Sequence, residues 1–148
     1  MRKETAIRIL SSLLILLFTY AALSKVADHA VFERQLKDFP LVEVWSNFFA
    51  WLIPLAEIFT ACFLFFPAAI LYGFYSSAIL LFGFTLFLVI MLAFDKNLPC
   101  SCGGVISKLS WTQHIAFNLF FLLLTATGII IQKKRRINNR FKKDDTLL

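Results

Sequence analysis

The chain has 148 residues, of which 59% are hydrophobic and 16% charged, and its mean hydropathy is +0.77. A water-soluble domain of this size would expose much of that apolar surface to water, so a soluble protein is excluded and a lipid bilayer is the expected solvent. The formal net charge is +6, but seven of the 15 Lys and Arg residues lie after position 132, which indicates a basic tail and excludes a nucleic-acid-binding surface.

Long uncharged windows predict four membrane spans, at about residues 7–24, 45–66, 68–94 and 111–132. The window 58–94 would be about 55 Å long as one helix, against a hydrocarbon core of about 30 Å, so it must fold back. Pro67 marks the turn, because proline disfavours helical geometry at the residue before it. We therefore predict an all-α, integral membrane four-helix bundle of up-down topology over residues 1–132, with a basic cytoplasmic tail over 133–148.

The loop between the first two spans has a helical pattern of its own. Apolar side chains recur at helical spacing at Val31, Phe32, Leu36 and Phe39, and charged residues fall mostly on the other side. This pattern predicts a short amphipathic helix on the outer membrane surface, and a packed connector without activity is the alternative.

The distribution of Lys and Arg predicts the orientation, because cytoplasmic ends carry more of these residues. Ten bases flank the two chain ends, against five between the spans, at Lys25, Arg34, Lys37, Lys96 and Lys108. Both termini are therefore expected in the cytoplasm, in an inner (plasma) membrane, with residues 95–110 on the oxidising side. A cleavable signal peptide over 1–24 is the alternative, and it would leave the other three spans unchanged.

The segment 95–110 holds two of the three cysteines, Cys100 and Cys102, one residue apart. A Cys-x-Cys disulfide closes a small strained ring, and strained disulfides are better suited to thiol-disulfide exchange than to a structural cross-link. A local structural disulfide, a site for Cu(I) or zinc and two unreacted thiols are the alternatives. Metal is the weakest of them, because His114 is the only further ligand at hand and a closed site needs four. No metal is predicted.

Polar residues inside the spans are few. Glu57 is the only acid within a span and lies near the midplane, about 18 Å from the outer end of span two, so it is expected to face the bundle interior and find a partner or take up a proton. Asn118 is its expected partner, and His114 shares the helix face of Asn118, closer to the cysteines. Lys25 closes the outer end of span one, and Pro54 is expected to kink span two. A polar track from the cysteines to Glu57 is predicted, and a purely structural role for Glu57 is the alternative.

Five short motifs between Tyr20 and about Leu124 resemble a known family. They resemble the MauE proteins (methylamine utilisation protein E) and the wider DoxX-like group of small four-helix membrane proteins. The specific element is the Cys-x-Cys loop between spans three and four. This chain departs from the usual pattern after the second cysteine, with Gly103, and before the span-four Asn, with Phe117. The motifs are Ser24-Lys25-Val26-Ala27-Asp28, Phe39-Pro40-Leu41, Ile53-Pro54-Leu55-Ala56-Glu57, Cys100-Ser101-Cys102-Gly103-Gly104 and Phe117-Asn118-Leu119.

The resemblance implies a redox-associated membrane protein that takes part in thiol-disulfide exchange or in the maturation of an exported protein. In this hypothesis of a membrane thiol:disulfide oxidoreductase, Cys100 and Cys102 are the redox pair, His114 is the proton acceptor and Glu57 is an intramembrane carboxyl group that carries a proton. The expected partners are the lipid bilayer and a thioredoxin-like or disulfide-containing exported protein. No cofactor motif is evident, and a quinone is suggested by fold-level similarity to DsbB. The alternative is a non-catalytic membrane partner or stabilising subunit of a redox or transport complex.

Overall fold

In the computed structural model, residues 2–37, 42–94 and 111–144 are described, and they contain helices but no strand. The elements are α1 (Arg2–Ala27), α2 (His29–Lys37), the 3-10 turn η1 (Glu43–Trp45), α3 (Ser46–Phe65), α4 (Ile70–Phe94) and α5 (Trp111–Asp144). The predicted all-α fold is confirmed.

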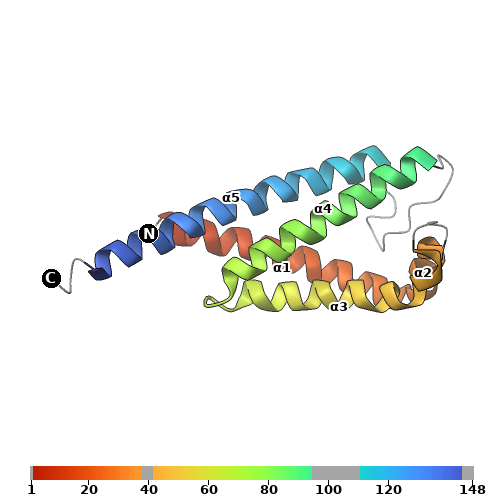
Figure 1. Cartoon of the computed structure of the whole chain (residues 1–148), viewed down its shortest axis with the longest axis horizontal. Helices are drawn as coiled ribbons and strands as arrows, with labels where there is room; N and C mark the ends of the chain where they lie inside the picture. The colour runs from red at the N-terminus through yellow and green to blue at the C-terminus, as the bar shows by residue number, and fades with distance from the viewer. Residues whose placement is uncertain (1, 38–41, 95–110, 145–148) are drawn as a thin grey trace.

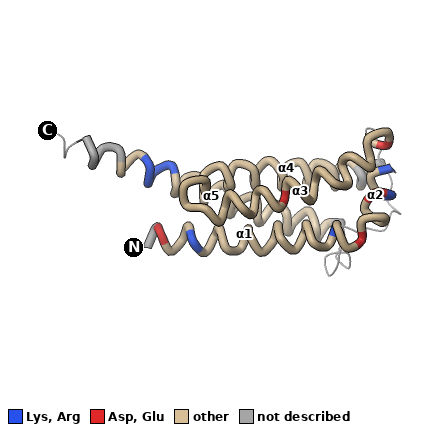
Figure 2. The backbone as a smooth tube through the Cα atoms, turned by 90° about the horizontal axis from the view of Figure 1, so that it is seen from below, with Lys and Arg blue, Asp and Glu red and all other residues tan. Residues whose placement is uncertain are grey.

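Within this described part, α1, α3, α4 and α5 are long and apolar enough to cross a membrane. The two termini and the turn between α3 and α4 lie at one end of the bundle, and α2 lies at the other (Figure 1). Figure 2 shows that charged residues gather toward the two ends and are nearly absent between them. The protein is therefore a multi-pass membrane protein with the predicted up-down arrangement.

The turn between α3 and α4 forms at the predicted proline. Phe66 has φ −85° and ψ 120°, the extended geometry that a following proline imposes. The chain then turns at once, and the backbone N–H of Ala69 donates to the carbonyl of Phe66 at 3.0 Å. Pro67 thus divides the long apolar window into two antiparallel helices.

Large apolar side chains lie on both the inside and the outside of the bundle. Leu14, Phe74 and Leu88 have no exposed surface, whereas Leu16, Ile79 and many others are exposed on the outer faces. The buried hydroxyl of Ser77 donates to the carbonyl of Gly73 in its own helix at 2.7 Å. This pattern is expected of helices packed within lipid: apolar side chains cover the outside, and buried hydroxyl groups donate to carbonyl groups of their own helix.

The predicted short amphipathic helix forms as α2, and its apolar face packs on the bundle. Its position on the outer membrane surface stays a prediction. Phe32 and Leu36 are buried together with Ala50 of α3. On the polar side, Lys37 and Glu33 form an ion pair at 2.7 Å, and the hydrogen bond from Lys37 lowers the pKa of Glu33 below its ordinary value. Phe39, the last residue of the predicted apolar stripe, lies outside the described residues.

The predicted basic tail begins as a helix. α5 passes the expected end of span four and runs on to Asp144. Arg135 in this extension forms an ion pair with Glu4 of α1, with 2.7 Å between Nη2 and Oε1. Both side chains are partly exposed, so this pair contributes little to stability but marks where the first and last helices lie side by side.

Candidate functional site

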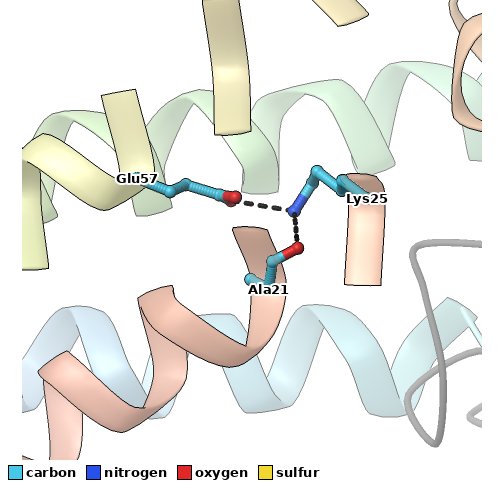
Figure 3. Close-up of polar contacts among 3 residues, drawn as sticks. All are labelled: Ala21, Lys25 and Glu57. Carbon is cyan, nitrogen blue, oxygen red and sulfur yellow. Dashed lines mark hydrogen bonds and ion pairs between the residues drawn. The ribbon is translucent and has the colours of Figure 1, made fainter. Parts of the chain in front are cut away.

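The most unusual feature inside the bundle is an ion pair between α1 and α3. Lys25 Nζ donates to Glu57 Oε1 at 2.8 Å, and the two side chains are only 4% and 2% exposed (Figure 3). The same ammonium group donates to the carbonyl of Ala21 at 3.4 Å. Side chains on a helix tilt toward its N-terminus, so Lys25, near the end of α1, directs its charge back along the helix toward the membrane interior.

This arrangement corrects two expectations. The expected partner of Glu57 was Asn118, but the hydrogen bond to its carboxylate comes from Lys25. Lys25 was also counted among the outer loop charges, whereas α1 continues to Ala27 and buries it. The physical reason is the length of the lysine side chain, which carries the charge about one helical turn away from its own Cα. Without Lys25, four bases remain in the two segments expected outside, so the difference in Lys and Arg on which the predicted orientation rests becomes larger. The orientation itself stays a prediction.

A small cavity lies where the four spanning helices meet, with a volume of about 40 Å³. Its polar lining comes from α1, α3 and α5, as Lys25, Glu57, His114 and Asn118. Two buried polar atoms of this lining, Glu57 Oε2 and Asn118 Nδ2, have no hydrogen-bond partner among the described residues. Its other lining residues are Leu17, Phe18, Ala21, Leu81, Phe84 and Phe117.

His114 and Asn118 owe their shared position to helix geometry. They are four residues apart near the start of α5, so both face the same side of the helix, and each is 6% exposed. The bundle therefore brings all four of the polar residues singled out in the spans to one cavity. Pro54 is also buried, one turn before Glu57, and α3 stays helical through it. The kink expected at Pro54 stays a prediction.

Cys100 and Cys102 lie outside the described residues. The segment that carries them runs from the end of α4 to the start of α5, and both of these helix ends lie at the end of the bundle where α2 is found (Figure 1). His114 lies in the first turn of α5, so it is the residue of the polar cavity that is closest in sequence to the cysteines.

Two features of this region could not be predicted from the sequence: the contact of Phe84 with Lys25 and an apolar groove. The ring centroid of Phe84 lies 4.6 Å from Lys25 Nζ, close enough for a cation–π contact, but nothing distinguishes this residue among 18 Phe. Phe84 also lines an almost wholly apolar groove of about 350 Å³ between α2, α3 and α4, together with Leu36, Phe49 and Phe87. Among the described residues, no group of three His, Cys, Asp or Glu could hold a metal ion.

Comparison with known proteins gives one match. The family model described as methylamine utilisation protein MauE matches residues 3–131. No curated protein and no solved structure matches the chain. The similarity to the wider DoxX-like group stays a prediction.

Proposed function

Because this chain is a multi-pass membrane protein that belongs to the MauE family, we propose that it takes part in thiol-disulfide exchange that matures an exported protein. The observation that carries the proposal is the position of the Cys-x-Cys pair. Cys100 and Cys102 lie in the segment joining α4 to α5, and the polar cavity begins within the first turn of α5. Thiols and groups able to move protons therefore belong to neighbouring parts of the chain.

The proposed exchange has two steps, which together move two electrons and two protons from the partner to the Cys pair. A thiolate of a thioredoxin-like or disulfide-containing exported protein attacks the Cys100–Cys102 disulfide, which opens it and forms a mixed disulfide. A second thiolate of the partner then attacks the mixed disulfide, so the partner gains a disulfide and the Cys pair gains two electrons and two protons. Reoxidation of the Cys pair removes the two electrons and the two protons. His114 is proposed to accept one proton, and Glu57 is proposed to carry one within the membrane.

A quinone is the proposed electron acceptor. Two electrons and two protons are what a quinone takes up when it becomes a quinol, and such a molecule reaches the protein through the lipid. The apolar groove beside Phe84 supports this proposal, because it offers a lipid-facing surface for an isoprenoid chain next to the polar cavity.

The exchange requires residues 95–110 to face the oxidising side of an inner membrane, with both termini in the cytoplasm. A reporter that is active only outside the cytoplasm should be active when fused after Lys37 or Lys108, and inactive when fused after Arg136. Protein blots should show equal expression of the fusions. Activity after Arg136 would reverse the orientation and remove the redox proposal with it.

Thiol trapping tests the exchange itself. In cells, Cys100→Ser or Cys102→Ser should leave one thiol that stays joined to the partner, seen as a band on a non-reducing gel that disappears on reduction. Cys62→Ser is the matched control, because Cys62 lies in α3 on an exposed face of the bundle, and it should leave exchange unchanged. If both loop variants retain full maturation of exported disulfide proteins and trap no partner, the protein is a non-catalytic membrane partner instead.

A further inference from the structure

We propose that the cavity between the four spans is a binding site for water, and that a bound water molecule joins Glu57 Oε2 to Asn118 Nδ2. The first support is the hydrogen bonding that the protein leaves incomplete. Glu57 is 1% exposed and Asn118 is 6% exposed, and neither of these two atoms has a partner among the described residues. A buried polar atom without a partner costs about 1–3 kcal/mol, and more when it is charged, so two of them facing one cavity indicate a ligand.

The size of the cavity fits water. Its volume of about 40 Å³ exceeds the roughly 10–15 Å³ that one water molecule needs by this measure. The same volume is too small for a quinone ring. The proposed site is distinct from the apolar groove, because Phe84 is the only lining residue that the two share.

The donors and acceptors also fit water. The amide Nδ2 of Asn118 donates, the carboxylate Oε2 of Glu57 accepts, and a water molecule between them does both. The Lys25 ammonium group, which also lines the cavity, has three donors, of which Ala21 and Glu57 take two. Two to four polar partners are what a buried water typically has.

The bound water also defines a path for protons. The titratable groups that face the cavity are Lys25 from α1, Glu57 from α3 and His114 from α5, and α4 contributes only Leu81 and Phe84. A water beside Glu57 Oε2 can pass a proton to or from this carboxyl group, whose other oxygen is hydrogen-bonded to Lys25. This second part rests on the proposed function, whereas water binding does not.

Proton-detected solid-state NMR on the full-length protein in lipid bilayers tests the site. With 15N-labelled Asn, the side-chain amide of Asn118 should show a cross peak to water that is protected from bulk exchange. Asn118→Leu fills the cavity with apolar atoms and assigns the peak by its loss. Thr125→Val is the control. Thr125 is buried in the same helix, but its hydroxyl donates to the backbone carbonyl of Phe121, so this substitution should leave the peak in place.

If Asn118→Leu fails to fold, Asn118→Ser serves for assignment, because a serine hydroxyl can also hold water. A spectrum of the unmodified protein in which the Asn118 amide contacts the carboxyl carbon of Glu57 directly and shows no water peak would overturn the proposal. Failure of the water site and failure of the proposed function can be told apart. A protein without thiol exchange can keep the water peak, and a protein with thiol exchange can lack it. If the path operates, Asn118→Leu should also slow reoxidation of the Cys pair while leaving the mixed disulfide intact.

Discussion

Replacing Lys25 by Met is expected to lower the free energy of unfolding by about 3–5 kcal/mol, because it leaves the buried carboxylate of Glu57 without its cation. The ion pair spans 2.8 Å between side chains that are almost fully buried, and it joins α1 to α3 in the centre of the bundle. No other described cation lines this cavity, so no nearby lysine or arginine can replace the lost charge. Unfolding in mixed micelles, followed by tryptophan fluorescence, measures the effect.

Lys37→Met is the matched control. Lys37 also pairs with a glutamate, at 2.7 Å, but its side chain is 53% exposed, so its loss should change the free energy of unfolding by no more than about 1 kcal/mol. If Lys25→Met and Lys37→Met have equal effects, the buried pair does not hold the bundle together.

The double variant Lys25→Met with Glu57→Gln removes both charges and should recover most of the lost stability, because replacing a buried ion pair by neutral groups of similar volume is often close to neutral. This variant also separates structure from function. If Glu57 only stabilises the bundle, the double variant should cycle Cys100 and Cys102 at the normal rate. If Glu57 carries a proton, the variant should fold yet reoxidise the pair slowly.

Replacing Gly73 by Ala is expected to destabilise the bundle by about 1–3 kcal/mol, because there is no room for a side chain where α4 crosses α3. A Cβ atom at Gly73 would lie 2.7 Å from the backbone nitrogen of Leu64, which cannot move without shifting α3. Gly128 of α5 is similar, since a Cβ there would meet the ring of Phe74, which is completely buried. The same unfolding measurement applies to both substitutions.

Gly83 provides an internal control in the same helix. A Cβ atom there would have no neighbour within 4 Å, so Gly83→Ala should be neutral or stabilise the helix by up to about 1 kcal/mol. If Gly73→Ala is as well tolerated as Gly83→Ala, the two helices do not depend on close backbone contact at this crossing.

The sequence by itself determined how many times the chain crosses the membrane and where it turns. A span needs about 20 apolar residues, so the length of an uncharged window sets the number of helices, and Pro67 imposes its turn on the residue before it. The apolar periodicity of 29–37 is equally local, and it predicts α2 because only one side of that helix is apolar. These properties depend on neighbouring residues in the chain, so a single sequence is sufficient to predict them.

Only the tertiary structure decided which polar groups meet. The spanning helices are apolar on nearly every side, so the few polar residues indicate which faces turn inward but not which helices bring them together. Glu57 was therefore expected beside Asn118, and its partner is instead Lys25, 32 residues away in the sequence and on a different helix. The rotation of each helix depends on close packing at sites such as Gly73 and Gly128, and that packing places Lys25, Glu57, His114 and Asn118 around one cavity.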